Sequence, residues 1–326
     1  MGKSKTAAWV DQFVLIGDLK MKAIRIQNFG GPEVMEVNEV SRPKPTDDEV
    51  LVKNMAVGVN PVDFKIREGQ YPEVKQDKLP LTMGREIAGV VELLGKNVTS
   101  FKKGDRVFAM IGADGGYAEY ARVPAAHLAR VPSSMDWRHA AGVPLAAHTA
   151  WQALVEHGQI ERGQKVLIHG GTGGVGHLAV QFARVKGAEV YATASTESLE
   201  FLRELGVDRA IDYEKEKFEE ICRNFDLVID LIGGETQARS WQVLGEGGRL
   251  VSTLEMPDAD HPQAAGKTGT RFTARPDGRE LAEIAGLLET GQIRVVIEQT
   301  FFLHEAAQAL DAVANQHIHG KVVLRI

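Results

Sequence analysis

A glycine-rich stretch at residues 170–176, GGTGGVG, is the part of the sequence that most clearly predicts chemistry. Three of its glycines have the spacing G-x-G-x-x-G, which is found where a strand turns into a helix beneath a bound dinucleotide. The first makes the tight turn, the second lets the backbone approach a pyrophosphate, and the third lets the helix pack closely. The free N–H groups at the start of the helix then bind the anion. We therefore expect a dinucleotide site at Gly171, Thr172, Gly173, Gly174, Val175 and Gly176.

The end of the next predicted strand bears on the choice between NAD and NADP. A carboxylate at that position binds the 2′-hydroxyl of NAD and repels the 2′-phosphate of NADP. The strand at 189–194 is followed by Ser195 and Thr196, whose small hydroxyl side chains leave room for a phosphate. Glu197 falls in the first turn of the next predicted helix, where it interacts favourably with the helix dipole. No Arg or Lys stands beside these residues, so the pattern favours NADP and keeps NAD as the alternative.

The pattern of elements around this loop predicts two kinds of domain. Short runs rich in Val and Ile between residues 21 and about 130 are separated by Gly, Pro, Asn and Asp, which is typical of a mostly β domain. From residue 133 the helical and strand patterns alternate, which predicts an α/β fold with a parallel, doubly wound sheet. We expect helices at 133–158, 174–186, 196–205, 214–223, 235–243 and 277–291, strands at 165–170, 189–194, 209–213, 225–233 and 248–254, a surface loop or flap at 256–270, and a last helix and strand at 304–316 and 321–326.

Composition and charge limit the classes of function. The 326 residues are 44% hydrophobic and 25% charged, which is typical of a soluble protein, and the length predicts two domains. The net charge of −6 argues against the basic patch that binding of nucleic acid requires. The single cysteine, Cys222, excludes a disulfide framework and a Cys-based zinc cluster, and it points to the reducing cytoplasm. No stretch has the roughly 18 apolar residues of a membrane span. Residues 1–20 lack a secretory signal pattern, and we expect them to be an extension or leader outside the fold.

Several further motifs occur in a characteristic order. They are NPVDFKIREGQYP, GREIAGVV, GGYAEYARVP, LAAHTAWQAL, the glycine stretch, VIDLIGGET and HGKVVLRI. Together they resemble the medium-chain dehydrogenase/reductase superfamily, and within it the zinc-free quinone oxidoreductase (zeta-crystallin-like) branch. The resemblance implies a GroES-like β-barrel catalytic domain over 21–132 and 295–326, a Rossmann domain over 133–294, and a cleft between them. It also implies a homodimer, with 271–276 or 294–299 as an edge strand of the Rossmann sheet.

Compared with the zinc-dependent members of that superfamily, the sequence departs at the metal ligands. Those relatives have a Cys, a His-Glu pair and a second Cys, whereas this chain has Asn60, Arg85-Glu86 and no cysteine near Leu145. The four cysteines of a structural zinc lobe are also missing. We therefore expect no zinc, and no activation of an alcohol by a bound metal.

The resemblance then implies hydride transfer from NADPH to an electrophilic acceptor, a quinone or an α,β-unsaturated carbonyl. Asn60 is the candidate to hydrogen-bond near the nicotinamide or the carbonyl, unless it only caps the turn before Pro61. Lys65 would polarise a carbonyl or donate a proton, with a solvated lysine as the alternative. Tyr71 would be a pocket wall or a proton donor, with an ordinary loop tyrosine as the alternative.

The resemblance also carries over a set of cofactor contacts outside the glycine loop. Thr149 matches a threonine near the nicotinamide, Tyr213 a residue at the adenosine end, and Lys321 a lysine near the cofactor. Ile232 and Ser252 fall at the ends of strands, where the crevice of a doubly wound sheet lies. Two histidines near these positions, His148 and His169, are interpreted as structural.

Two other functions remain open at this point. One is a reductase of enoyl thioesters, which needs a cleft open enough for a pantetheine arm. The other is an NADPH-binding protein with vestigial activity, either crystallin-like or RNA-binding, although the acidic balance argues against RNA.

Overall fold

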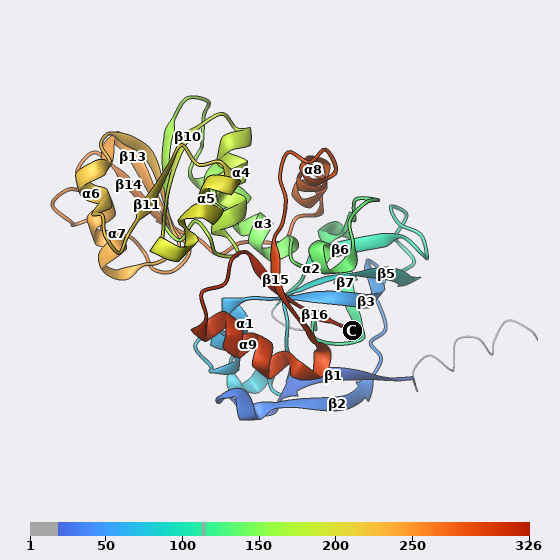
Figure 1. Ribbon diagram of the computed structural model, residues 1–326. Helices are drawn as coiled ribbons and strands as arrows, with labels where there is room; N and C mark the ends of the chain where they lie inside the picture. The colour runs from blue at the N-terminus through green and yellow to red at the C-terminus, as the bar shows by residue number, and fades with distance from the viewer. Residues whose placement is uncertain (1–18, 113–114) are drawn as a thin grey trace, which may run out of the picture.

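The computed structural model describes residues 19–112 and 115–326, which form two lobes (Figure 1). One lobe combines strands from the beginning and the end of the chain, and the other contains a parallel sheet from its middle. Residues 1–18 of the predicted extension lie outside the described residues. Strand β1 starts at Lys20, one residue before the expected start at Met21.

The parallel sheet has six strands in the order β11-β10-β9-β12-β13-β14, and every neighbouring pair is parallel. This is the order of a doubly wound dinucleotide-binding sheet, in which the direction of winding reverses between β9 and β12. Ligands of such sheets bind beyond the carboxyl ends of the strands at that reversal. The strands are β9 (Lys165–Ile168), β10 (Glu189–Ala194), β11 (Arg209–Asp212), β12 (Phe225–Asp230), β13 (Leu244–Ser252) and β14 (Thr268–Arg271).

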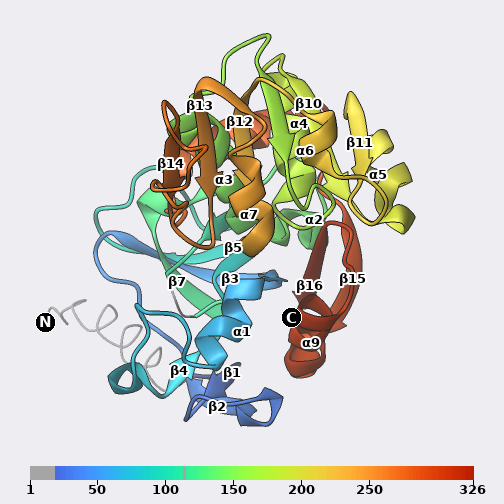
Figure 2. The same cartoon turned by 90° about the vertical axis from the view of Figure 1, so that its left-hand side faces the viewer.

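Helices cover both faces of this sheet because its side chains alternate between two cores. Val166 and Ile168 of β9 belong to the core beneath α3 and α4, whereas Leu167 belongs to the core that contains Phe218 of α6. Figure 2 shows α6 and α7 in front of the strands. The helices of this region are α3 (Pro144–Trp151), α4 (Gly176–Val185), α5 (Leu199–Leu205), α6 (Phe218–Ile221) and α7 (Gly234–Ser240).

The other lobe has a seven-stranded sheet in the order β15-β16-β3-β5-β6-β8, with β7 also paired to β3, and a three-stranded sheet β2-β1-β4. The last two strands of the chain, β15 and β16, thus return to the lobe that the first strands build. Its strands are β1 (Lys20–Ile26), β2 (Met35–Ser41), β3 (Glu49–Val59), β4 (Leu81–Thr82), β5 (Glu86–Leu94), β6 (Arg106–Met110), β7 (Tyr120–Pro124), β8 (Ala129–Arg130), β15 (Ile297–Phe302) and β16 (Lys321–Arg325).

Four helices lie at or near this second sheet. Helices α1 (Pro61–Arg67) and α9 (Ala306–Asn315) contact each other, as Figure 1 shows. Helix α2 (Trp137–Ala141) packs on β3, β5 and β16, and α8 (Gly278–Glu289) contacts β8 as well as α3. Both α2 and α8 come from the predicted Rossmann range 133–294, so that range contributes helices to the contact between the lobes. As domain bounds, 21–132, 133–294 and 295–326 stay a prediction.

The α/β prediction is confirmed, and several elements differ from expectation. The helix expected over 133–158 breaks between α2 and α3, because Gly142 and Pro144 interrupt it, and α3 ends in a π-helical turn (Gln152–His157). The loop expected over 256–270 ends in β14. Residues 294–299 were wrong as a Rossmann edge, because β15 pairs with β16 in the other sheet. Strand β2 and helix α1 were not predicted at all.

Two further findings concern the described part of the chain. None of its helices is both long and apolar enough to cross a membrane. Cys222 is buried in the core that contains Phe218, and burial raises the pKa of its thiol to about 12.

Candidate functional site

The glycine stretch forms the turn from β9 into α4. A Cβ atom on Gly176 would overlap the carbonyl oxygen of Gly170, so only glycine allows the helix to start this close to the turn. A Cβ on Gly171 would lie 2.8 Å from Ala192 of β10 and 2.9 Å from Leu202 of α5. Gly173 has space around it, since the nearest atom to an added Cβ is 3.7 Å away. The loop therefore packs tightly on one side and is open on the other.

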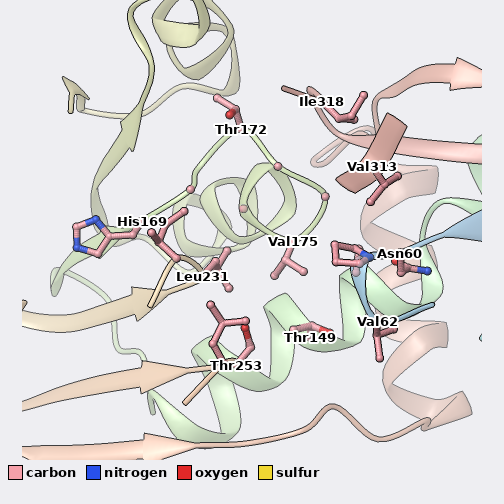
Figure 3. A pocket seen from close by; sticks show the side chains of 18 of the residues that line it. Asn60, Val62, Thr149, His169, Thr172, Val175, Leu231, Thr253, Val313 and Ile318 are labelled. Atoms are coloured by element: carbon pink, nitrogen blue, oxygen red, sulfur yellow. The ribbon is translucent and has the colours of Figure 1, made fainter. Parts of the chain in front are cut away.

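The open side of the loop faces a cavity of about 1020 Å³ between the two lobes. Figure 3 shows the loop, with Thr172 and Val175, next to Thr149 of α3, with Asn60 at one side and His169 and Thr253 at the other. The cavity is as large as the upper range of small-ligand sites. It lies beyond the carboxyl ends of β9, β10 and β12, where the strand order predicts a ligand.

Most of the predicted site residues line this one cavity. They are Asn60, Lys65, Tyr71, Thr149, Thr172, Gly173, Gly174, Val175, Gly176, Ser195, Tyr213, Ile232 and Lys321. Three predicted residues do not line it. Gly171 packs on β10 and α5, the Thr196 hydroxyl donates to Asp212 at 2.7 Å, and Ser252 is buried and donates to Asp230 at 2.9 Å. Thr253, next to Ser252, lines the cavity instead.

The end of β10 lies among hydroxyl groups and carboxylates. The Ser195 Oγ is 2.9 Å from the Ser198 Oγ, which is 2.8 Å from the His319 Nε2. The Thr196 N–H donates to Glu214 at 3.0 Å, and Lys215 lies 3.4 Å from Asp212.

The hydrogen bonds from Thr196 lower the pKa of both Asp212 and Glu214, so both carboxylates are ionised at neutral pH. Sequence reasoning looked for an acid only after β10. It missed these two because Asp212 ends the neighbouring strand β11 and Glu214 follows it.

Asn60 and Lys321 belong to a buried group centred on Glu86. The Asn60 side-chain amide donates to Glu86 at 2.7 Å. The Lys321 ammonium lies 2.8 Å from the same carboxylate and also donates to the side-chain oxygen Oδ1 of Asn60. The Leu145 N–H donates to the other Glu86 oxygen at 2.7 Å. Glu86 therefore joins the end of β3, the start of α3 and the start of β16.

Asn60 stands at the N-cap position of α1, where its backbone N–H donates to Asp63 at 2.9 Å. Its side chain binds Glu86 and Lys321 and forms no hydrogen bond to the backbone of α1. Asp63 is buried, and burial raises its pKa to about 6, although the Tyr117 hydroxyl donates to it at 2.8 Å.

The remaining predicted polar residues have internal partners. Thr149 lines the cavity, and its hydroxyl donates to the Leu145 carbonyl at 2.8 Å. His148 is fully buried between the Pro144 carbonyl and the backbone of Asp277. His169 lies between Thr193 and Ser240, and burial lowers its pKa to about 4, so it is neutral. Both histidines have the satisfied surroundings of structural residues.

Tyr71 lies beside a residue that the sequence analysis did not select for the site. The Arg85 guanidinium donates to the Tyr71 hydroxyl at 3.3 Å and to the Gly112 carbonyl at 3.3 Å. Arg85 is only 7% exposed and lines the cavity. The sequence held a signal for Arg85, since it directly precedes the apolar strand EIAGVV. An arginine at such a position is expected to be buried, and arginine is rarely buried without a partner.

The side chains at the expected ligand positions do not fit a zinc ion. In the described ranges 19–112 and 115–326, no group of three or more His, Cys, Asp or Glu side chains is placed to hold a metal. Glu86, the one carboxylate at those positions, is bound by Lys321 and Asn60.

Comparison with known proteins gives the family. Residues 46–133 match the alcohol dehydrogenase GroES-like domain, and residues 205–324 match a family described as zinc-binding dehydrogenase. An NADPH-dependent alkenal/one oxidoreductase of Arabidopsis thaliana (chloroplastic) is 36% identical over 318 residues, which cover 94% of this chain and 79% of the relative. A quinone oxidoreductase of Homo sapiens is 31% identical over 321 residues, 93% of this chain and 96% of the relative.

The same relationship holds for solved structures. The quinone oxidoreductase from Coxiella burnetii superposes with a TM-score of 0.89 at 32% identity, covering 94% of this chain and all of that one (100%). Fold, cavity position and sequence relatives thus agree, and the chain belongs to the medium-chain dehydrogenase/reductase superfamily, as a relative of its quinone and alkenal/one oxidoreductases.

Proposed function

We propose that this protein transfers a hydride from NADPH to a quinone or an α,β-unsaturated carbonyl compound without using zinc. The observation that carries the proposal is the cavity that joins the glycine loop and Thr149 of α3 to Asn60 and Tyr71 of the other lobe. The names of the Arabidopsis and human relatives support both classes of acceptor.

The cavity fits a dinucleotide. The open side of Gly173 and the N–H groups at the start of α4 suit a pyrophosphate. Tyr213 and Ile232 are about half exposed at strand ends (52% and 54%), as expected for apolar side chains that a ligand covers. Thr149 and Lys321 would then lie toward the nicotinamide. When bound, the nicotinamide supplies the hydride, and the protein binds and orients both reactants.

Three side chains on the facing wall are proposed to act on the acceptor. Asn60 has one amide N–H left after its bond to Glu86, and this N–H is available to the nicotinamide or the carbonyl. The Tyr71 hydroxyl accepts from Arg85, which leaves its own proton free to be donated. Lys65 reaches the cavity from α1 and adds positive charge near the acceptor.

NADPH is proposed over NADH because Ser195, Ser198 and His319 offer donors at the end of β10. NADH remains the second candidate, because Asp212 and Glu214 lie close by and would repel a 2′-phosphate. The Lys215 ammonium offsets part of that repulsion.

The test is NADPH oxidation by the purified chain, followed by absorbance, with a panel of quinones, enals and enoyl thioesters and with a chelator present. We expect turnover with quinones or enones that the chelator does not change. Tight NADPH binding without turnover of any acceptor would contradict the proposal and favour the vestigial binding protein. Turnover confined to thioesters would favour the enoyl reductase.

We also propose a homodimer that pairs through β14, one of the two edge strands of the parallel sheet. Light scattering should give twice the chain mass of 35.6 kDa, and Thr268→Pro, at the start of β14, should shift the protein toward monomer. A monomeric wild type would contradict the proposal. The cytoplasmic location expected from the single cysteine stays a prediction.

A further inference from the structure

The cavity wall beside Tyr71 carries a positive charge that the proposed roles do not yet use. Arg85 lies between β4 and β5, is 7% exposed, and donates only to the Tyr71 hydroxyl and the Gly112 carbonyl among the described residues. Both bonds are 3.3 Å long, and both acceptors are neutral. No carboxylate in residues 19–112 and 115–326 forms an ion pair with this guanidinium.

The neighbouring charges are arranged differently. The positive charge of Lys321 is neutralised by the Glu86 carboxylate at 2.8 Å, and both side chains are almost fully buried. Asp63, the other buried carboxylate of this wall, binds the Tyr117 hydroxyl and the Asn60 N–H. It interacts with Arg85 electrostatically, which offsets part of the rise in the Asp63 pKa that burial causes, but it forms no hydrogen bond or ion pair with the guanidinium. A buried charge without an ion-pair partner is costly, and charged groups in such surroundings inside a cleft are candidates for a functional site.

Reduction of an enone or a quinone creates such a negative charge. The β-carbon of an enone receives the hydride that NADPH supplies, the C=C electron pair moves to form the new Cα=C bond, and the carbonyl pair moves onto oxygen. The resulting enolate takes a proton from solvent at the α-carbon and becomes the saturated carbonyl compound. A quinone that accepts hydride and one proton becomes a hydroquinone. In both cases the oxygen is the atom that needs donors as charge develops.

We propose that Arg85, together with the Tyr71 hydroxyl that it orients, forms the binding site for the acceptor oxygen and stabilises the negative charge that develops on it. This inference rests on the proposed function. Arginine suits the role because it stays protonated at every working pH and its donors have fixed directions. Tyr71 adds a second donor, because its oxygen already accepts from Arg85 and its proton remains available.

The first test compares Arg85→Met and Arg85→Lys with Arg122→Met, an exposed arginine outside the cavity. Arg85→Met should lower kcat for an enone about 100-fold or more, in the range for loss of an oxyanion donor, with the Kd for NADPH changed less than about twofold. Arg85→Lys should recover part of the loss, and Arg122→Met should match the wild type. Wild-type kcat in a folded Arg85→Met would overturn the inference.

The second test does not depend on turnover. In the presence of NADP⁺, 4-nitrophenol bound in the cavity reports its own ionisation by absorbance, because phenolate absorbs at longer wavelength than phenol. The wild type should lower the pKa of the bound phenol by about one unit more than Arg85→Met does, with Arg85→Lys between the two, because a fixed guanidinium stabilises the anion. Equal pKa values in wild type and variants would overturn the inference.

The two tests also separate the two proposals. If the wild type reduced neither quinones nor enones, the proposed function would fail, and the phenol titration would still decide whether Arg85 binds an anionic oxygen. If Arg85→Met did not fold, as judged by its Tm, both kcat and the pKa of the bound phenol would be compared between the wild type and Arg85→Lys.

Discussion

At the scale of single residues, the cavity contains charges that form ion pairs and charges that do not. Lys321 and Glu86 neutralise each other within the wall, and Lys215 lies 3.4 Å from Asp212 at the end of β11. Arg85 forms no ion pair among the described residues, although it interacts electrostatically with Asp63. Its positive charge lies near the proposed acceptor, where the reaction develops a charge of the opposite sign.

Ser195→Asp tests the cofactor choice at this scale. A carboxylate at the end of β10 would repel a 2′-phosphate and accept a bond from a 2′-hydroxyl. We expect the Kd for NADPH to rise at least about tenfold, or about 1.4 kcal/mol, while the Kd for NADH changes little. Fluorescence titration of both cofactors measures this, with the exposed Ser100→Asp as control. A larger loss of NADH than of NADPH affinity would contradict the proposed preference.

Single residues could be predicted where a motif carries them, as with Thr172, Gly173 and Thr149, which all line the cavity. Asp212 and Glu214 could not, because their approach to Thr196 depends on the pairing of β10 with β11. The same limit applies to Glu86, whose partner Lys321 is 235 residues away in the sequence.

At the scale of elements, hydrogen bonds hold the glycine loop and the start of α4 to the residues just before β15 and β16 of the other lobe. Its Thr172 carbonyl accepts from the Gly320 N–H at 2.8 Å, just before β16. His177, in the first turn of α4, contacts the Gly173 carbonyl at 3.0 Å and accepts from the Val296 N–H at 3.3 Å. The loop therefore depends on the segment that leads back to the first lobe.

Two glycine variants separate packing from binding. Gly176→Ala places a methyl group against the Gly170 carbonyl and should lower the free energy of unfolding by about 2 kcal/mol and abolish NADPH binding. Gly173→Ala meets its nearest atom at 3.7 Å, so its stability should stay that of the wild type while the Kd for NADPH rises. Thermal unfolding and NADPH titration measure both. Unchanged NADPH affinity in Gly173→Ala would argue against a pyrophosphate at this loop.

His177 predicts a pH effect on stability. Burial is the main cause that lowers its pKa from 6.5 to about 4, so the unfolded chain binds the extra proton between these values. The folded state is therefore stabilised above pH 6.5 and loses that stability as the pH falls toward about 4. The difference in free energy of unfolding between wild type and His177→Gln should change by about 1.4 kcal/mol per pH unit in this window. Denaturant unfolding at several pH values measures it, and a constant difference would contradict the assignment.

Elements were predictable where Val and Ile mark a buried strand, as in β9, β10 and β12. Strand β2 was missed because its sequence MEVNEVS is largely polar and its side chains are mostly exposed. Strand β14, TGTR, has no apolar run and is held only by its pairing with β13. Local sequence cannot report a strand whose stability comes from its neighbour.

At the scale of the whole molecule, one buried carboxylate joins parts of the chain that are far apart. Glu86 begins β5 and binds Asn60 after β3, the Leu145 N–H of α3, and Lys321 of β16. The proposed catalytic wall and the contact between lobes thus share a single ion pair.

Removing one partner of that ion pair should lower the free energy of unfolding more than removing both partners. Glu86→Gln leaves the Lys321 ammonium buried without its counter-charge, and we expect the free energy of unfolding to fall by about 3 kcal/mol. Adding Lys321→Met removes the unpaired charge and should restore most of the loss. Urea unfolding of the single and double variants measures this, and a double variant as unstable as the sum of both single variants would show that the pair is not coupled.

Isotope labelling follows the proposed transfer of a hydride from NADPH to the acceptor carbon most directly. NADPH carrying deuterium at the transferred position of C4 is incubated with the protein, an enone and a chelator, and the product is analysed by mass spectrometry. We predict a saturated carbonyl compound with one deuterium on its β-carbon. A reduced product without deuterium at that carbon would show that the hydride does not come from NADPH.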